Sequence, residues 1–374
     1  MSGANFMNKL LVGVTVEWKA LGTVIKTVTA PAKLKSESYR TKGRLPIVDQ
    51  GIEFIAGFTD EDVTPVEAGE YVIFGDHSEH IKYVDFPFIQ GADGLKILRP
   101  ISANAKYIYH AFLNFYTKEL NYKRHWSTAQ QTLIPIPCPG NPQKSLEIQA
   151  EIVRILDAFT ELTAELTTEL TTRKKQYSYY RDQLLGFEVG GVEWKTLGEI
   201  VSTITTGKLN ANAMTEGGAY PFFTCDANPF RIDTFAFDTE AIIVSGNGSH
   251  VGHINYYKGK FNAYQRTYVL ADCAQEITMG FLLAHLKAYL RPYIIQHSKK
   301  GSVPYITMPI LHNFKVPVPS LDRQLEITSI LDKFDALTTS LTEGLPREIE
   351  LRQKQYEYYR EMLLTFPKPD GVEA

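Results

Sequence analysis

The stretch RKKQYSYYRDQLLGF at residues 173–187 returns as RQKQYEYYREMLLTF at residues 352–366, with ten of the fifteen aligned positions identical. Nearer the start of the chain, VEWKALG at residues 16–22 returns as VEWKTLG at residues 192–198. Matches that recur in the same order indicate an internal duplication, which decides the architecture before any local pattern does. We therefore expect two similar units in this chain of 374 residues, which is long enough for two cores.

Two shorter landmarks lie between these anchors and give each unit the same internal order. IPIPCP at residues 134–139 corresponds to VPVPSL at 316–321, and ILDAF at 155–159 corresponds to ILDKF at 330–334. Each unit is thus a variable segment, a proline-rich exit and then a helix. The pattern is typical of a fixed scaffold that carries two different variable parts.

A long amphipathic helix is predicted at residues 146–185, and a second at 321–364. At a rise of 1.5 Å per residue the first would be about 60 Å long, which favours pairing with a similar helix. Gly344 and Pro346 should break or kink the second helix. Antiparallel pairing would relate the two halves by a pseudo-twofold axis. The apolar stripe of the first helix consists of Ile152, Ile155, Phe159, Leu162, Leu166, Leu170, Tyr177, Tyr180 and Leu184.

The variable segments read as mixed α/β domains with short strands bounded by Gly, Asp and Asn. The predicted fold class is therefore α+β: two similar mixed domains separated by two long antiparallel helices that form a coiled coil. Strands are expected at residues 71–74, 241–245 and 268–271, and helices at 105–120 and 279–295.

Composition points to a cytoplasmic protein and is unfavourable for a nucleic-acid binder. Cys138, Cys225 and Cys273 show no spacing that suggests disulfides or a zinc site. No apolar run approaches the length needed to span a bilayer, and the start lacks the pattern of a signal peptide. The formal net charge of −3 argues against phosphate binding, which depends on clustered Lys and Arg.

Catalytic motifs are absent or incomplete, so we expect a chain without catalytic machinery. Asn228-Pro229-Phe230 lacks the second proline of an adenine methyltransferase motif and is better explained as a turn. The glycines at 246, 248 and 252 have the wrong spacing for a dinucleotide site, and Gly207-Lys208 lacks the rest of a phosphate-binding loop. The histidines at 77, 80, 250 and 253 have no cysteine or acidic cluster to complete a metal site.

The repeated segments KQYSYYRDQLL and KQYEYYREMLL resemble the specificity subunits of type I restriction-modification systems, and the resemblance covers nearly the whole chain. The echo in TELTAELTTEL, residues 160–170, is similar to a repeat of that family. Residues 371–373 repeat the lead-in to Trp194, as the family's circular organisation implies. The domains implied are target recognition domain 1 at 1–143, a central spacer and docking helix at 144–187, target recognition domain 2 at 188–320, a C-terminal helix at 321–366 and a tail at 367–374.

The resemblance implies a DNA-recognition function exercised through partner subunits. Each domain would read one half of a split target in double-stranded DNA, while the helices set the spacing and dock two methyltransferase subunits. Those subunits would methylate adenine N6 with S-adenosylmethionine, and restriction subunits would cleave DNA with ATP and Mg²⁺. This chain would bind none of these cofactors and no metal.

Two loops are the best candidates for DNA contact: GDHSEHIK at residues 75–82 and SGNGSHVG at residues 245–252. Both follow a predicted strand, and each is followed within about 15 residues by a glutamine. Small polar side chains of this kind can bond to base edges and phosphates, and Gln or Asn can pair with adenine. An ordinary polar hairpin is the alternative.

Basic segments with interleaved aromatic residues add phosphate-binding candidates at residues 33–44, 121–126 and 297–302, although a solvated surface explains each of them equally well. The complete set of candidate DNA contacts is Lys33, Lys35, Arg40, His77, Ser78, His80, Lys82, Gln90, Lys123, Arg124, Lys208, Asn247, Ser249, His250, Gln265, Arg266, Lys299 and Lys300. The candidate docking residues on the two helices are Tyr177, Tyr180, Arg181, Tyr356, Tyr359 and Arg360.

Other functions remain open at the level of sequence. The chain could be a protein scaffold whose two repeats bind no DNA, or the specificity subunit of a methylation-only or type II-like restriction system. A fused nuclease or methyltransferase is a further alternative, although two variable domains leave little room for a catalytic one.

Overall fold

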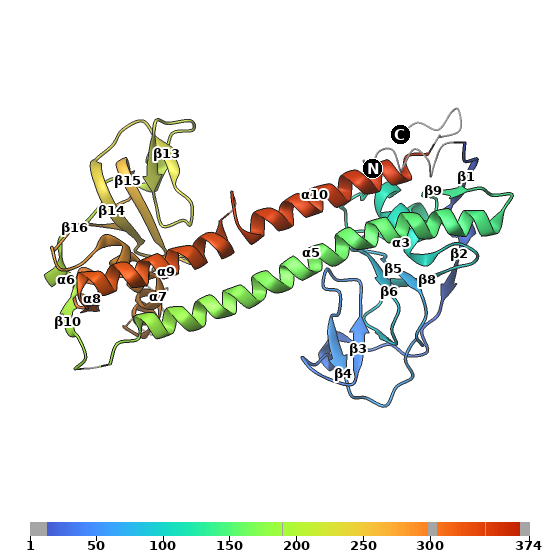
Figure 1. The fold of residues 1–374 in the computed structure, drawn as a ribbon, viewed down its shortest axis with the longest axis horizontal. Helices are drawn as coiled ribbons and strands as arrows, with labels where there is room; N and C mark the ends of the chain where they lie inside the picture. Colours follow the sequence, from blue (N-terminus) through green and yellow to red (C-terminus); the bar gives the residue numbers. More distant parts are fainter. Residues whose placement is uncertain (1–12, 189, 298–304, 341, 367–374) are drawn as a thin grey trace. The chain divides into compact units, whose positions relative to one another are not determined.

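The computed structural model describes residues 13–188, 190–297, 305–340 and 342–366 (Figure 1). The chain divides into two compact units: unit 1 consists of Met1–Leu166 with Ile349–Ala374, and unit 2 of Thr167–Glu348. Among the described residues, no helix is both long enough and apolar enough to cross a membrane.

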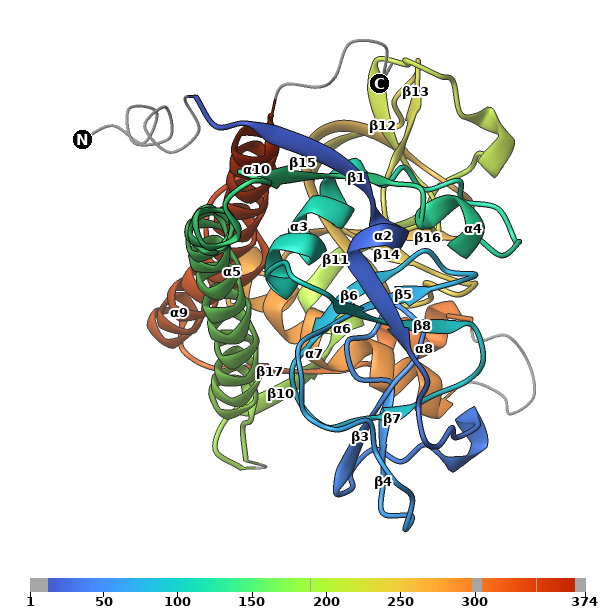
Figure 2. The same cartoon turned by 90° about the vertical axis from the view of Figure 1, so that its right-hand side faces the viewer.

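Unit 1 contains three small sheets and the helix α3, which packs against β5, β6 and β8 (Figure 1). The strand orders are β1-β9, β2-β8-β5-β6 and β4-β3-β7, and Figure 2 shows β8, β5 and β6 close together. Asn104 caps α3, because its side chain accepts a hydrogen bond from the Tyr107 backbone NH at 3.0 Å. The elements are β1 (Val16–Ala20), α2 (Leu21–Val24), β2 (Ile25–Val28), η1 (Ser36–Ser38), β3 (Leu45–Val48), β4 (Gly57–Thr59), β5 (Tyr71–Gly75), β6 (Ile81–Val84), β7 (Ile89–Gln90), β8 (Leu95–Pro100), α3 (Ala105–Phe115), α4 (Trp126–Ala129) and β9 (Leu133–Pro137).

Unit 2 has strand orders β10-β17 and β11-β16-β14-β15-β12-β13. Helix α6 begins with a capping box. The Thr196 side chain accepts a hydrogen bond from the Glu199 backbone NH, and the Glu199 side chain accepts one from the Thr196 backbone NH. The elements are β10 (Glu193–Thr196), α6 (Leu197–Ile200), β11 (Val201–Thr206), η2 (Ala211–Ala213), β12 (Tyr220–Phe223), β13 (Phe230–Ile232), β14 (Phe237–Ser245), β15 (Ile254–Ala263), β16 (Thr267–Cys273), α7 (Met279–His297), α8 (Met308–His312) and β17 (Lys315–Val318).

The two units share one topology although their variable segments share little sequence. The order β2-β8-β5-β6 in unit 1 matches β11-β16-β14-β15 in unit 2. The long strand β15 also pairs in parallel with β12, as β7 pairs with β3. Strand β15 of unit 2 is therefore equivalent to β6 and β7 of unit 1 together. The predicted α+β fold with two similar mixed domains is confirmed.

The long helices match the prediction with shifted ends. Helix α5 (Pro142–Leu185) begins four residues before the predicted start, while α9 (Leu321–Thr339) and α10 (Leu345–Leu364) replace one continuous helix. Gly344 lies in the break at a φ of +82°, a conformation that favours glycine. Pro346 was also expected to break or kink the helix. It lies instead in the first turn of α10, where its missing NH removes no hydrogen bond of the helix.

Equivalent aromatic residues join the long helices within each unit. In unit 1, Phe159 of α5 stacks on Tyr359 of α10 at 4.9 Å between ring centroids. In unit 2, Tyr180 of α5 stacks on Phe334 of α9 at 5.7 Å. The partner's number falls as the α5 number rises, which is the order of antiparallel pairing. Phe159 and Phe334 end the matching ILDAF and ILDKF motifs, so each repeat supplies the phenylalanine for the other's tyrosine.

The core of each unit is built in the same way from a variable helix and the long helices. In unit 1, Phe112 of α3 is buried with Leu156 of α5 and Leu363 of α10. In unit 2, Phe281 of α7 is buried with Leu185 of α5 and Leu331 of α9. The helices that the sequence placed at 105–120 and 279–295 are α3, which ends five residues earlier, and α7, which continues to His297 in spite of Pro292.

Candidate nucleic-acid interface

The predicted loop at residues 75–82 forms the turn between the antiparallel strands β5 and β6. Gln50, two residues after the end of β3, organises this turn. Its side-chain oxygen accepts from the His77 backbone NH at 3.1 Å, and its backbone carbonyl accepts from the Ser78 hydroxyl. His80 Nδ1 lies 3.3 Å from the same carbonyl. Nothing in the sequence pattern distinguished Gln50, because its role depends on a contact with a distant segment.

Two buried carboxylates fix a second loop, residues 116–126, to this turn. Asp76 accepts a hydrogen bond from the Trp126 backbone NH at 2.8 Å. Glu79 accepts from the Tyr116 hydroxyl at 2.6 Å and from the backbone NH groups of Glu119 and Leu120, both at 2.8 Å. Burial alone would raise the pKa of Glu79, but these hydrogen bonds hold the pKa below its ordinary value. The charged carboxylate therefore orders the loop.

The result is a polar and aromatic cluster, the unit 1 loop cluster, that joins two segments singled out by the sequence. His77 stacks on Tyr122 with 5.5 Å between ring centroids, and its Nδ1 lies 3.1 Å from the Lys123 carbonyl. Tyr122 itself is 92% exposed. Tyr122 lies within the basic segment at residues 121–126, but its own role could not be predicted from the sequence, because it depends on the contact with His77. The cluster consists of His77, Ser78, His80, Tyr122, Lys123 and Arg124.

The remaining basic candidates of unit 1 are exposed. The ammonium of Lys33 forms an ion pair with Asp93 at 3.2 Å, and Asp93 in turn accepts from the Gln50 side chain at 3.1 Å through its backbone carbonyl. Arg40 pairs with Asp60 at 3.4 Å. Lys35 is exposed at the start of η1. Exposed pairs of this kind are weak, so the cations remain available to phosphate.

Two candidates are corrected because the structure buries them. Lys82 is 6% exposed, and its ammonium donates to the backbone carbonyls of Asp49 and Glu53 at 2.8 and 2.5 Å. Gln90 is 4% exposed in β7. The glutamines that follow the two loops, Gln90 and Gln265, are not structurally equivalent. Val48 at the end of β3 pairs with Gln90, whereas Phe223, at the matching end of β12, pairs with Ala263.

In unit 2 the predicted loop at residues 245–252 forms the corresponding turn between β14 and β15. Close backbone approaches hold it to its neighbours. The Gly246 NH donates to the Arg266 carbonyl at 2.9 Å, and the Gln265 NH donates to the Leu209 carbonyl at 2.9 Å. A Cβ on Gly246 would lie 2.1 Å from the Arg266 carbonyl oxygen, and one on Gly207 would lie 1.8 Å from that of Ala263. Only glycine fits at either position.

These contacts bring together six candidates on three loops, the unit 2 loop cluster. Ser249, His250, Gln265 and Arg266 are exposed, and Asn247 forms a β-bridge with Tyr305, an exposed aromatic residue that sequence analysis missed. Lys299 and Lys300 lie outside the described residues. The cluster consists of Lys208, Asn247, Ser249, His250, Gln265 and Arg266.

The six candidate docking residues on the helices divide into two groups. Tyr177 and Tyr180 lie against Phe334, and Arg181 pairs with Asp182 at 2.7 Å. The equivalent residues of α10 have contacts within unit 1. Tyr356 is hydrogen-bonded to His110, Tyr359 stacks on Phe159, and Arg360 donates to Asn114 at 3.3 Å.

A more exposed tyrosine recurs one position before each stacked one. Tyr179 and Tyr358 are each 60% exposed, and each meets the next tyrosine edge-on at 5.4 Å. Sequence analysis did not select them, because both lie off the apolar stripe. Tyrosine is enriched among the residues that contribute most to protein–protein binding.

The loop clusters offer what base-edge and phosphate contacts require: amide, hydroxyl and imidazole groups beside Lys and Arg. Among the described residues, no three His, Cys, Asp or Glu side chains are grouped so that they could hold a metal ion. Their chemistry is that of binding by hydrogen bonds and charge.

Comparison with known proteins gives consistent matches. Residues 190–351 match the family described as type I restriction modification DNA specificity domain. The type I restriction enzyme EcoR124I/EcoR124II specificity subunit of Escherichia coli is 39% identical over 404 aligned positions that cover all of both chains. The EcoprrI specificity subunit of the same species is 41% identical over 221 residues, 56% of this chain and 54% of that protein.

A solved structure shares the fold. The crystal structure of a type I restriction-modification S subunit from M. genitalium aligns with a TM-score of 0.65 and covers 96% of this chain and 98% of that one. Its sequence identity is 16%, so this likeness concerns the fold alone.

Proposed function

This chain belongs to the family of type I restriction-modification specificity subunits, and from that premise we propose that it reads a two-part DNA target, with one half read by each unit. The observation that carries the proposal is the matched position of the two loop clusters. Each is built on the same hairpin of the same topology, yet the two clusters present different side chains. Equivalent frames with different loops are what two readers of different half-sites require.

Within this proposal the chemistry belongs to partner subunits. Two methyltransferase subunits would bind S-adenosylmethionine and modify adenine N6, and restriction subunits would use ATP and Mg²⁺ to cleave DNA. This chain would supply sequence recognition without catalysis and without a cofactor of its own. Its net charge of −3 then has a reason, since the partners would provide part of the phosphate contact.

The long helices would set the distance between the half-sites. Helix α5 is 44 residues long and contains the echoed stretch TELTAELTTEL. Four more helical residues add about 6 Å, and a B-DNA base pair rises about 3.4 Å. Insertion of one further TELT tetrad would therefore lengthen the unread spacer of the target.

The proposal is tested by mapping N6-methyladenine in the DNA of cells that carry this chain with its methyltransferase subunit. The expected result is one split motif with an unread spacer, absent from cells that have the methyltransferase subunit alone. Methylation that does not depend on this chain, or a chain that assembles with partners but is indifferent to DNA sequence, would favour the protein-scaffold alternative instead.

A further inference from the structure

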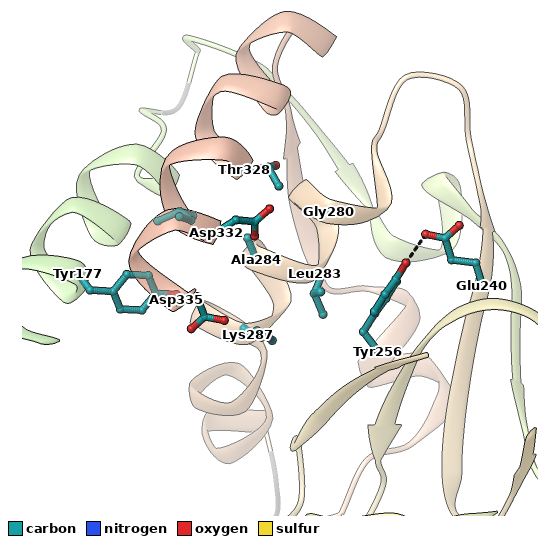
Figure 3. Close-up of a pocket in the computed structure, with 11 residues that line it drawn as sticks. Tyr177, Glu240, Tyr256, Gly280, Leu283, Ala284, Lys287, Thr328, Asp332 and Asp335 are labelled. Atoms are coloured by element: carbon teal, nitrogen blue, oxygen red, sulfur yellow. Dashed lines mark hydrogen bonds between the residues drawn. The ribbon is translucent and has the colours of Figure 1, made fainter. Parts of the chain in front are cut away.

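Unit 2 contains a hollow of about 410 Å³, here named the α7–α9 hollow, that opens to solvent between helices α5, α7 and α9 and the sheet (Figure 3). Gly280 and Ala284 of α7, Asp332 of α9 and Tyr256 of β15 are among the residues that line it. Three carboxylates line it, compared with one lysine. The lining residues are Tyr177, Glu240, Tyr256, Gly280, Leu283, Ala284, Lys287, Thr328, Leu331, Asp332 and Asp335.

The internal repeat identifies the same place in unit 1 on the helix side. The Gln149 side chain accepts from the Asn104 backbone NH at 2.8 Å, and Gln324 accepts in the same way from Thr278 at 2.7 Å. These two equivalent bonds align α3 of unit 1 with α7 of unit 2, so that Asn104 corresponds to Thr278. Two residues further along lie Lys106 in unit 1 and Gly280 in unit 2. Six residues along, the pair is His110 and Ala284, and the facing aspartates of the ILD motifs are Asp157 and Asp332.

The sheet side of the hollow is equivalent too. Tyr83 lies opposite Val72 in the β5–β6 pair, and Tyr256 lies opposite Ile242 in the β14–β15 pair. Each tyrosine hydroxyl donates to a glutamate on the neighbouring segment: Tyr83 to Glu70 at 3.0 Å and Tyr256 to Glu240 at 2.6 Å. The aspartate and the tyrosine that enclose the hollow are therefore present in both units.

In unit 1 a lysine of the chain itself fills this place. The Lys106 ammonium lies 2.6 Å from the Asp157 carboxylate and 5.4 Å from the centroid of the Tyr83 ring. The imidazole of His110 lies 3.6 Å from the same carboxylate and is hydrogen-bonded to the Tyr356 hydroxyl at 2.9 Å. Ion pairing and cation–π attraction thus hold one cation between an aspartate and a tyrosine.

In unit 2 both filling side chains are lost, but the groups that receive the cation remain. Asp332 is exposed, and it has no ion-pair partner among the residues that the structure describes. Lys287 at the rim supplies one positive charge, and Lys258 lies 3.5 Å from Glu240. Asp332 and Asp335 are left to give the hollow a net negative character. The position that the Lys106 ammonium occupies in unit 1 is therefore open in unit 2, and the negative charge around it is complementary to a basic side chain.

We infer that the α7–α9 hollow receives a lysine or arginine side chain of the methyltransferase subunit, in the place that Lys106 occupies in unit 1. The inference rests on the proposed function, because it assumes that this subunit docks on the long helices. Tyr177, from the repeated KQY segment on α5, lines the same hollow. A surface of this kind would distinguish the two units, since unit 1 already supplies its own cation.

The test measures the affinity of the purified full chain for the methyltransferase subunit by isothermal titration calorimetry. Asp332→Asn keeps the shape and removes the charge, so we expect binding about tenfold weaker. Glu326→Gln is the matched control, because it removes one negative charge from the same helix outside the hollow and should change affinity less than about twofold. Ala284→Lys, which provides an internal cation, should weaken binding at least as much as Asp332→Asn without lowering the melting temperature.

The outcomes separate this inference from the function on which it rests. If the unaltered chain does not bind the methyltransferase subunit, both fail. If it binds, and Asp332→Asn binds as tightly as Glu326→Gln, or Ala284→Lys binds as tightly as the unaltered chain, the inference alone is wrong. Weakened DNA binding with unchanged subunit binding would also overturn it.

Discussion

Unit 1 and unit 2 hold equivalent recognition loops by partly different means. In unit 1, the buried carboxylates of Asp76 and Glu79 accept hydrogen bonds from the loop at residues 116–126. In unit 2 the Gly246 NH donates to the Arg266 carbonyl at 2.9 Å, and unit 1 has the equivalent bond from the Asp76 NH to the Gly94 carbonyl at 2.6 Å. Unit 2 thus has a glycine where unit 1 has the Asp76 carboxylate. A shared topology therefore does not impose a shared way of ordering its loops.

The difference teaches how a duplicated frame can diverge. Strands and the tyrosine–phenylalanine stacks keep their places in both units, while the loops replace one set of local interactions with another. Hydrogen bonds to a carboxylate depend on its charge. Hydrogen bonds between closely approaching backbone segments depend on the absence of a side chain between them. Substitutions that remove charge should therefore affect mainly unit 1, whereas a Cβ added at a closely packed glycine should affect either unit, as the surroundings of Gly75 and Gly207 indicate.

The largest expected effect is that of Gly207→Ala in unit 2. The new Cβ would lie 1.8 Å from the Ala263 carbonyl oxygen, so backbone must move, at a cost of about 3 kcal/mol in the free energy of unfolding. Urea unfolding measures the loss, and hydrogen exchange should assign it to unit 2. Gly191→Ala is the control, because its nearest neighbour lies at 3.5 Å. Equal stability of the two variants would contradict the account of unit 2.

Glu79→Gln should destabilise unit 1 by about 2 kcal/mol, since an amide cannot accept all three of the hydrogen bonds that the carboxylate accepts. Hydrogen exchange should show lost protection at residues 116–125. Glu67→Gln, which alters an exposed carboxylate of the same unit, should have no measurable effect. Unchanged protection in Glu79→Gln would show that packing alone orders the loop.

The aromatic stacks should differ by about 1 kcal/mol in favour of unit 1. Tyr359 lies half-buried against Phe159 at 4.9 Å, whereas Tyr180 is exposed and lies 5.7 Å from Phe334. Tyr359→Ala should therefore lower the free energy of unfolding more than Tyr180→Ala does. A double-mutant cycle with Phe159→Leu and Phe334→Leu measures each coupling, and a stronger coupling in unit 2 would reverse the comparison.

Acid should produce the smallest effect, and mainly in unit 1. The pKa of Glu79 lies below its ordinary value of 4.5 in the folded chain, so its ionisation stabilises the fold above pH 4.5. That stability is lost as the pH falls from 4.5 through the lower folded pKa. Protection factors at residues 116–125 should fall in this range more than those at 207–210. The same fall in Glu79→Gln would assign the effect to another group.

The frame was predictable from sequence, because identical anchors and helical periodicity are local signals. The α+β class, the family and the break near Gly344 followed from them. The interior of the loop clusters was not predictable, because Lys82 resembles a surface cation until Asp49 and Glu53 are known to surround its ammonium. Gln50 and Tyr122 were missed for the same reason: their importance depends on residues far away in the sequence.

The α7–α9 hollow was also invisible in the sequence. It becomes apparent only when the packing of α3 on α5 is compared with the packing of α7 on α9. This comparison aligns Lys106 of unit 1 with Gly280 of unit 2. In a duplicated chain, a binding position of this kind is recognised because one copy lacks a side chain that fills the same position in the other copy. The roles of the loop clusters in DNA contact stay predictions.

The most direct test of two independent readers is to alter one loop cluster at a time and map the methylated motif in cells. Arg124→Ala changes unit 1, and Arg266→Ala changes unit 2. We predict that each variant relaxes the sequence requirement in one half of the split motif, and that the two variants affect different halves. If both relax the same half, or each relaxes both halves equally, the two units do not read separate half-sites and the account is wrong.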